Sequence, residues 1–430
     1  MFKFNFDIEE ADTEALNNLS LDEKPNADQK DQPASPEQAA LAAYKSHTVS
    51  ELIDKLPEVV SYTPTEIPLA SGRRLTLARR DLFDARYQLI AEADVSLPNE
   101  VPIGEASAAD AAPADPTRTP AFLDAPSDLI PGLYEGGLKT WECSLDLVDY
   151  LDGLTPASEG TSAGAAGICN WAGKRVLEIG CGTAIPSLYL LHEIFQDERK
   201  PSEVPQTRIT LQDYNASVLE LITLPNLLIA WCMSAHFHRS YEFIQLPVSP
   251  PPADESTATK PDPTIPGDIH ITPTLKAAFL STLAERNIEI ELVSGSWENI
   301  LRERFQDSAA DSTYDLVLTS ETIYRTESLG ALIGIMRTAC AQAASTGPQS
   351  TGAGSSSTDP SAGSSSRPAR DVSLGGKPLC LVAAKVLYFG VGGGLPDFVR
   401  AVEDGGLGHV ETVLERTKGV GRKVLRVEWK

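Results

Sequence analysis

The sequence feature that most constrains the fold is a short apolar strand that ends in two closely spaced glycines and runs directly into a helix. Residues 175–180 (RVLEIG) predict a buried strand, and the apolar spacing of residues 185–195 (IPSLYLLHEIF) predicts a helix. Gly180 and Gly182 lie between them, where glycine lets the backbone turn sharply and approach a ligand closely. This unit favours an α/β domain that binds its ligand at the carboxyl ends of parallel strands.

Strands and helices continue to alternate along the rest of the chain. The apolar patterns predict strands at residues 208–215, 288–297, 314–324 and 377–389, and helices at residues 216–231, 328–343 and 395–406. We expect the helix at 216–231 to bend near Pro225. The chain closes with residues 409–416 and 423–429, which predict two strands joined by a turn. Together these elements predict a doubly wound, Rossmann-like parallel sheet with an antiparallel C-terminal hairpin.

Two low-complexity stretches interrupt this domain. Residues 247–267 are rich in proline and residues 342–376 in serine and glycine, so we interpret both as insertions in surface loops, where long excursions cost little free energy. What remains is enough for one α/β domain. We therefore assign residues 125–430 to this domain and residues 1–124 to an N-terminal arm.

The arm carries most of the acidic excess of the chain. Residues 1–150 contain 28 Asp or Glu and 12 Lys or Arg, and the formal net charge of the whole chain is −24. Residues 7–40 and 94–120 are too polar to bury the apolar surface that would offset the entropy lost on ordering. Between them, residues 41–93 form an island with a basic cluster that includes Arg73. The island is either an ordered segment packed on the domain or a segment that binds a partner.

The composition excludes several classes of protein. Tight binding to nucleic acid or to an anionic membrane surface needs clustered Lys and Arg, and the chain has no basic domain. No stretch approaches the 18 consecutive apolar residues of a membrane span, and the N-terminus lacks the apolar run of a signal peptide. The six cysteines include no Cys-x-x-Cys pair, so neither a zinc site nor a disulfide framework is indicated. We therefore expect a reduced, intracellular enzyme or adaptor.

The glycine loop lacks the marks of a phosphate-binding loop. A dinucleotide fingerprint needs a third glycine where the chain has Ile185, and Pro186 removes a backbone N–H near the start of the helix. No Gly-Lys-Ser/Thr follows, which excludes a P-loop. A phosphate-free adenosine ligand, S-adenosylmethionine, fits better, and Glu178 suits its positive charge either directly or by orienting the loop. The alternative is an ordinary tight turn.

Polar residues end the other strands at the same predicted edge. Asp213 ends the second strand, where a carboxylate can accept hydrogen bonds from both ribose hydroxyls. Gly295, Ser296 and Trp297 end the third strand, where the turn can reach an adenine, and residues 319–321 end the fourth beside the reacting methyl group. Taken singly, Asp213 could cap a helix and Trp297 could be a core aromatic residue. Taken together, these residues predict a cofactor site.

At these positions the chain resembles the seven-stranded S-adenosylmethionine-dependent methyltransferases. More narrowly, it is similar to the histidine protein methyltransferases that modify the large-subunit ribosomal protein uL3. The resemblance is carried by GGLKTWECSLDLVDYL (136–151), VLEIGCGTAIPSL (176–188), LQDYNASVL (211–219), SGSW (294–297), LTSETIY (318–324) and AAKVLYFGVGGG (383–394). Relatives that methylate lysine usually carry Asp-x-x-Tyr after the fourth strand, where this chain has Glu321 and Tyr324.

The resemblance implies a role for each matching position. It places Trp141 and Glu142 over the cofactor, with Lys139, Thr140 and Cys143 alongside. The methionine part of the cofactor would lie at Glu178, Gly180 and Gly182, the ribose at Asp213 and Asn215, and the adenine at Ser296 and Trp297. The transfer site would be lined by Thr319, Ser320 and Glu321. The chain departs from many methyltransferases at Ala184, where they have a third glycine, and in its two long insertions.

The candidate catalytic residues are Glu321 and Tyr324. Histidine is a convenient acceptor because its pKa of about 6.5 leaves it mostly neutral at pH 7, whereas a lysine at about 10.4 must first lose a proton. The carboxylate of Glu321 could hold the second ring N–H and select the tautomer, or it could be a structural hydrogen-bonding residue. We interpret Tyr324 as a wall of the acceptor channel rather than a base, and Lys385 and Tyr388 as channel lining or core.

These observations predict a protein-histidine N-methyltransferase that acts on the tele nitrogen of a histidine in a basic ribosomal protein. The alternatives are a lysine methyltransferase of the same superfamily, a non-catalytic adaptor that keeps the fold, and, less favoured, a methyltransferase for small molecules. We expect a monomer without a metal ion, without sequence-specific binding to nucleic acid and without membrane association. Because ribosomal proteins are assembled in the nucleus, we expect the enzyme in the cytoplasm and the nucleus.

Overall fold

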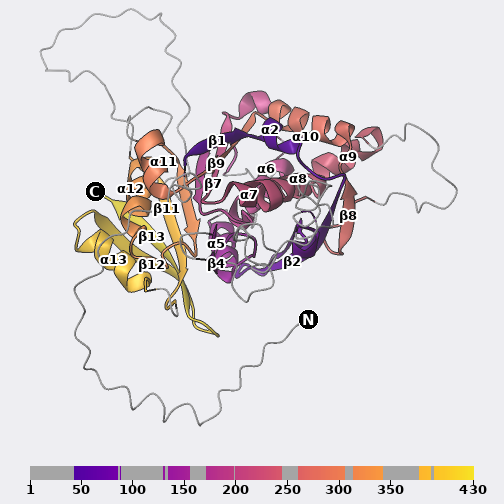
Figure 1. Cartoon of the computed structure of the whole chain (residues 1–430). Coiled ribbons are helices and arrows are strands. Elements are labelled where there is room, and N and C mark those ends of the chain that lie inside the picture. The colour runs from indigo at the N-terminus through magenta and orange to yellow at the C-terminus, as the bar shows by residue number, and fades with distance from the viewer. Residues whose placement is uncertain are drawn as a thin grey trace, which may run out of the picture.

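Eight strands form the central sheet, in the order β1-β9-β7-β6-β10-β11-β13-β12 (Figure 1). They are β1 (Lys45–Thr48), β6 (Arg175–Ile179), β7 (Thr207–Asp213), β9 (Ile288–Ser294), β10 (Leu316–Ser320), β11 (Leu379–Lys385), β12 (Gly408–Arg416) and β13 (Arg422–Trp429). The computed structural model describes residues 43–85, 88, 129–130, 134–154, 171–197, 199–244, 260–305, 313–341, 377–388 and 392–430. The expectations for residues 7–40, 94–120, 247–259 and 342–376 lie outside these ranges.

The sheet is mostly parallel. The five strands from β9 to β11 run parallel to one another, and β13 and β12 add an antiparallel hairpin at one edge. The predicted α/β class with a large, mostly parallel sheet is therefore confirmed. At the other edge β1 pairs antiparallel with β9, with Lys45 opposite Ser294, so the sheet has eight strands rather than seven.

Helices cover both faces of this sheet. The consecutive residues Val176 and Leu177 of β6 are buried in two different apolar clusters, because successive strand residues point to opposite faces. The first cluster takes in α2 (Val49–Ile53), α5 (Glu142–Gly153), α6 (Ile185–Gln196), α8 (Leu224–Cys232), α9 (Ala235–Ile244) and α10 (Pro273–Glu285). The second takes in α11 (Trp297–Arg304), α12 (Leu329–Ala339) and α13 (Leu395–Glu403).

A π-helical turn interrupts the helix predicted over residues 216–231. The segment consists of α7 (Ala216–Val218), the π-helical turn η5 (Leu219–Thr223) and α8. Pro225 lies in the first turn of α8 and has no N–H to donate, and the wider turn ahead of it accommodates that loss. The turn also contacts the glycine loop, because the hydroxyl of Thr223 donates to the carbonyl oxygen of Gly182 at 2.7 Å.

A second, three-stranded sheet comes from the N-terminal island and a segment far along the chain. Its order is β3-β2-β8, formed by β2 (Val59–Pro68), β3 (Arg74–Arg80) and β8 (Gly267–His270). Val60 and Leu77 of this sheet share a buried cluster with Leu147 of α5, so the island packs on the domain. The short elements β4 (Leu129–Ile130), β5 (Tyr134–Glu135) and η4 (Pro201–Glu203) complete the described structure, in which no helix has the length and apolarity to cross a bilayer.

Candidate active site

One cavity of about 400 Å³ lies at the carboxyl ends of β6, β7, β10 and β11. Its volume is typical of sites that hold a small organic ligand. The predicted site residues that line it are Lys139, Trp141, Gly180, Gly182, Asp213, Trp297, Ser320, Glu321 and Tyr324. The fold therefore brings most of the predicted cofactor and acceptor positions to a single cavity at the expected edge of the sheet.

The glycine loop forms one end of the cavity, and its backbone leaves no room for side chains. Gly180 and Gly182 have φ of +63° and +50°, a region that favours glycine. A Cβ on Gly180 would lie 2.5 Å from Cγ2 of Thr322, and one on Gly182 would lie 3.1 Å from the carbonyl oxygen of Gly137. The carboxylate of Asp213 holds the loop, because its Oδ2 accepts from the N–H of Gly182 at 2.9 Å.

Ala184 stands where many methyltransferases have a third glycine, and it adopts the left-handed backbone conformation that favours glycine. Ala184 precedes α6 with φ of +56° and ψ of +27°, the left-handed conformation that costs a non-glycine residue about 1–2 kcal/mol. Its N–H donates to the carbonyl oxygen of Cys181 at 2.6 Å, and its side chain is fully buried. The loop geometry therefore persists at this position despite the substitution.

Gln212 connects the strand ends around the loop and was not identified from the sequence. Its Oε1 accepts from the N–H of Gly180 at 3.2 Å and from the indole N–H of Trp297 at 3.0 Å. Its Nε2 donates to the carbonyl oxygen of Gly295 at 3.2 Å. This buried amide therefore positions both the loop and the Trp297 ring. The available signal was a polar residue directly before Asp213 at the end of a strand.

Glu178 faces the first turn of α6 and does not line the cavity. Its Oε2 accepts from the backbone N–H of Ser187 at 3.0 Å and from the Ser187 hydroxyl at a shorter distance. Burial raises the pKa of Glu178 to about 8. Of the two roles open to Glu178, this geometry corresponds to orienting the loop and helix rather than to touching a ligand.

Seven other predicted cofactor positions are not among the residues that line the cavity. The Thr140 hydroxyl donates to the hydroxyl of Thr183 at 3.1 Å, the Thr319 hydroxyl donates to the carbonyl oxygen of Ile179 at 2.8 Å, and Glu142 is exposed. The amide of Asn215 donates to the carbonyl oxygen of Gly136, and Ser296 caps α11. A Cβ on Gly295 would lie 2.6 Å from the carbonyl oxygen of Ala43. Cys143, the last of the seven, is described below.

The carboxylate of Glu321 lines another part of the same cavity wall, which we call the other end of the cavity. Glu321 follows β10 in a left-handed conformation with φ of +59°, an uncommon backbone for a residue with a side chain. The Tyr388 hydroxyl and the Cys143 thiol lie close enough to this carboxylate for its charge to act on them. Burial, with the nearby carboxylate, raises the pKa of both groups, so both stay protonated at neutral pH.

Lys385 completes this end, which we call the Glu321 cluster (Cys143, Trp141, Glu321, Lys385 and Tyr388). Its Nζ lies 3.4 Å from Oε1 of Glu321 and 4.3 Å from the centroid of the Trp141 ring. Oε1 itself is buried and accepts no hydrogen bond from any residue that the structure describes. The 3.4 Å contact is thus a charge pair without an aligned hydrogen bond, and Oε1 retains capacity for a further donor.

Tyr324 lines the cavity beside this cluster. Its ring centroid lies 6.4 Å from that of Tyr388. Its carbonyl oxygen accepts from the N–H of Gly393 at 3.0 Å, and a Cβ on Gly393 would lie 2.6 Å from the same carbonyl. The glycine run at 392–394 therefore lets the chain pack directly on the backbone of Tyr324.

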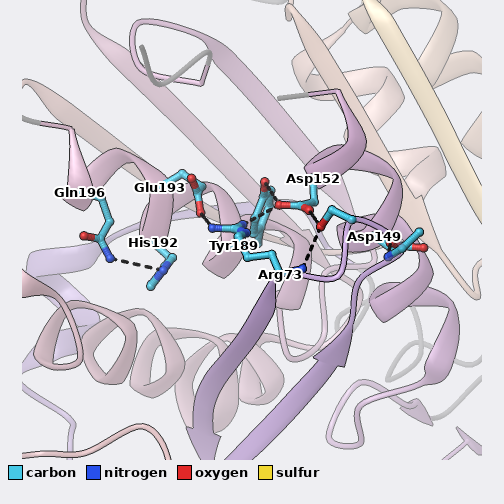
Figure 2. Close-up of polar contacts among 9 residues, drawn as sticks. Arg73, Asp149, Asp152, Tyr189, His192, Glu193 and Gln196 are labelled. Carbon is cyan, nitrogen blue, oxygen red and sulfur yellow. Dashed lines mark hydrogen bonds and ion pairs between the residues drawn. The ribbon is translucent and has the colours of Figure 1, made fainter. Parts of the chain in front are cut away.

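Arginines from both ends of the chain hold α5, which begins directly after Trp141. Arg73 pairs with Asp152 at 2.6 Å and with Glu193 of α6 at 2.9 Å, and Figure 2 shows its guanidinium between the two carboxylates. From the C-terminal hairpin, Arg422 pairs with Asp146 at 2.6 Å and Arg416 pairs with Asp149. The N-terminal island and the hairpin thus fix the helix that presents Trp141 to the cavity.

Comparison with known proteins gives one consistent group of relatives. "Histidine protein methyltransferase 1" of Saccharomyces cerevisiae is 30% identical over 361 residues, which cover 83% of this chain and 77% of that protein. The protein of the same name from Schizosaccharomyces pombe is 28% identical over 387 residues, covering 89% and 84%. "Histidine protein methyltransferase 1 homolog" of Bos taurus is 26% identical over 304 residues, covering 71% and 58%. No protein-family model matches the chain.

Proposed function

The chain belongs to the histidine protein methyltransferase family, and on this premise we propose that it transfers a methyl group from S-adenosylmethionine to a histidine of the ribosomal protein uL3. One observation carries the proposal. The glycine loop and the largely buried carboxylate of Glu321 line a single cavity, and Oε1 of that carboxylate accepts no hydrogen bond within the described structure. Such a carboxylate suits a neutral imidazole that has one N–H to donate.

The residues at the glycine end fit the cofactor we propose. Gly180 and Gly182 would pass close to the methionine part, and the Trp297 ring, which Gln212 holds, would lie against the adenine. Asp213 would accept from the ribose hydroxyls, because it lines the cavity and a carboxylate can accept several hydrogen bonds. When bound, the cofactor supplies a methyl group on a positively charged sulfur.

At the other end, Glu321 would orient the acceptor ring. A neutral imidazole that donates its pros N–H to Oε1 of Glu321 presents the lone pair of its tele nitrogen toward the glycine end. The new N–C bond forms as the S–C bond breaks, and the sulfur keeps the bonding electron pair. The positive charge that this leaves on the ring is lost when the N–H proton passes to Glu321 and then to water. The protein contributes mainly alignment, worth up to about 7–11 kcal/mol for well-held reactants.

Charge supports a basic protein substrate. The chain carries a formal net charge of −24, and residues 1–150 hold 28 acidic against 12 basic side chains. Opposite net charges accelerate encounter between an enzyme and its substrate, and ribosomal proteins are strongly basic. A free ribosomal protein, before RNA covers it, would therefore be attracted to this enzyme.

The test is to incubate the purified protein with methyl-labelled cofactor and recombinant uL3, and to locate the label by mass spectrometry. We expect one methyl group on one histidine, on the tele nitrogen. Label on lysine alone would instead support the lysine-specific alternative. Calorimetry with S-adenosylhomocysteine separates the other alternative, since a non-catalytic adaptor would not need to bind it.

A further inference from the structure

Lys385 lies between the two groups of the cavity that could best receive a cation. One is the Glu321 carboxylate, with Oε1 at 3.4 Å from the ammonium, and the other is the face of Trp141, with its centroid at 4.3 Å. The side chains of Lys385 and Glu321 are only 17% and 10% exposed, so the pair is largely shielded from water. Both residues, with Trp141, line the cavity itself.

We infer that Lys385 is a specificity-determining residue, which excludes ammonium acceptors from the transfer site and so favours the neutral imidazole of histidine. The inference rests on the proposed function and deepens it, because it concerns which side chain the same site accepts.

A lysine acceptor would enter the cavity mainly as its cationic ammonium. A cationic ammonium is recognised by carboxylates and by the faces of aromatic rings. In this cavity the ammonium of Lys385 already forms a charge pair with the carboxylate and lies over the face of the ring. A second ammonium would meet like charge in a poorly solvated site, where charge interactions are stronger than in water.

The number of charges in the cavity also favours a neutral acceptor over a cationic one. Lys385 contributes one positive charge and Glu321 one negative charge, and the proposed cofactor brings one further positive charge that the reaction passes to the acceptor. A neutral imidazole adds none, whereas a protonated lysine adds a second charge without a partner. At pH 7 only about one lysine in a few thousand is neutral, given a pKa of about 10.4. Lys385, as a cation, is not a base that could take the surplus proton.

An imidazole can use the site without displacing Lys385. Its N–H needs one acceptor, and Oε1 of Glu321 accepts no hydrogen bond from the described residues although Lys385 lies beside it. The hydroxyl of Tyr388 and the thiol of Cys143 also lie near this carboxylate and stay protonated, because burial raises the pKa of both groups. The ring can therefore complete the hydrogen bonding of Glu321 while the charge pair stays intact.

The experiment compares two substrates and three enzymes. The substrates are recombinant uL3 and the same protein with its labelled histidine replaced by lysine. The enzymes are the wild type, Lys385→Met, which keeps the length of the side chain without its charge, and Lys385→Arg, which keeps the charge. The readout is the ratio of kcat/KM on the histidine substrate to that on the lysine substrate, which a merely structural role would not change.

We expect the wild type to prefer histidine by at least about 100-fold and Lys385→Met to lower that ratio by at least about tenfold, through a gain on lysine. Lys385→Arg should keep the ratio within about threefold of the wild type. A Lys385→Met ratio equal to that of the wild type overturns the inference and leaves the proposed function intact. A wild type that labels neither substrate overturns the proposed function and this inference with it. Lys385→Gln serves the same comparison if Lys385→Met does not fold.

Discussion

The two ends of the cavity are built in different ways. The glycine end is made of backbone, because Gly180 and Gly182 adopt left-handed conformations and a Cβ on either would meet neighbouring atoms. The other end, the Glu321 cluster, is made of side chains that come from α5, from β11 and from the turns after β10 and β11. A backbone-built end tolerates few substitutions, whereas an end built of side chains can change its chemistry by single substitutions. Single substitutions can test whether a change at the glycine end affects cofactor affinity alone and a change at the other end affects turnover of the acceptor alone.

The largest effect is expected at the glycine end, from Gly180→Ala. The added Cβ would lie 2.5 Å from Cγ2 of Thr322, which is buried and hydrogen-bonded to Thr319, and the backbone φ of +63° is unfavourable for alanine. We expect the Kd for S-adenosylhomocysteine to rise at least about 100-fold in calorimetry, equivalent to about 3 kcal/mol.

Two further variants control this result. Gly330→Ala places the same methyl group on an exposed position of α12 where no atom lies within 4 Å, so cofactor affinity should stay within about twofold. The double variant Gly180→Ala with Thr322→Ser removes the clashing Cγ2 and should recover part of the affinity. Unchanged affinity in Gly180→Ala would show that the loop does not approach the cofactor.

The next effect is expected at the other end, from Glu321→Gln. Glutamine keeps the shape of the side chain but cannot accept the ring proton, so kcat on uL3 should fall by about 100-fold or more. Cofactor affinity should change by less than about threefold, because we assign Glu321 to the acceptor and not to the cofactor. The matched control is Glu327→Gln, since the Glu327 side chain is 73% exposed. A parallel loss of cofactor affinity would show that the two ends are not separable.

The glycine end could be predicted from the sequence better than the Glu321 cluster, because it is built from local patterns. Gly180, Gly182 and Asp213 were identified because a strand end, a glycine loop and the next strand end are local patterns that fix position along the chain. Trp297 was identified for the same reason, although the amide that holds it, Gln212, was not. The main helices and the strands of the parallel sheet also follow from local periodicity.

The features that were missed depend on pairing between distant segments. Residues 45–48 lie opposite residues 291–294, and residues 59–62 lie opposite residues 267–270, so neither pairing is visible in a local window. The contact of Lys385 with Trp141 likewise joins the end of β11 to the start of α5. The predicted site positions that do not line the cavity, such as Glu178 and Thr319, have the right strand ends but side chains that point into the protein.

A smaller effect, on both stability and affinity, is expected from Gln212→Leu. The change leaves the N–H of Gly180, the indole N–H of Trp297 and the carbonyl of Gly295 without their partner. We expect the free energy of unfolding in denaturant to fall by about 2 kcal/mol and the cofactor Kd to rise about tenfold. Gln196→Leu, at an exposed position of α6, is the matched control and should change neither. An effect on the acceptor alone would contradict the position of Gln212 at the glycine end.

The smallest effect is expected from Arg73→Met, which asks whether the N-terminal island supports the acceptor end. Arg73 is 40% exposed, so the pair with Asp152 is worth less than a buried one, but Asp152 is 7% exposed and would lose its cation. We expect the free energy of unfolding to fall by about 1 kcal/mol and kcat/KM on uL3 to fall by about two- to fivefold, because α5 then holds Trp141 less firmly.

A double-variant cycle with Asp152→Asn separates this pairing from other effects of losing Arg73, since the asparagine removes the buried charge and should restore part of the stability. Arg302→Met is the control, because Arg302 is 59% exposed and pairs with a neighbouring exposed residue. Cofactor affinity should remain within about twofold in Arg73→Met. If affinity falls while kcat is unchanged, α5 serves the glycine end, and the island then belongs to the cofactor half of the molecule rather than to the half that selects the acceptor.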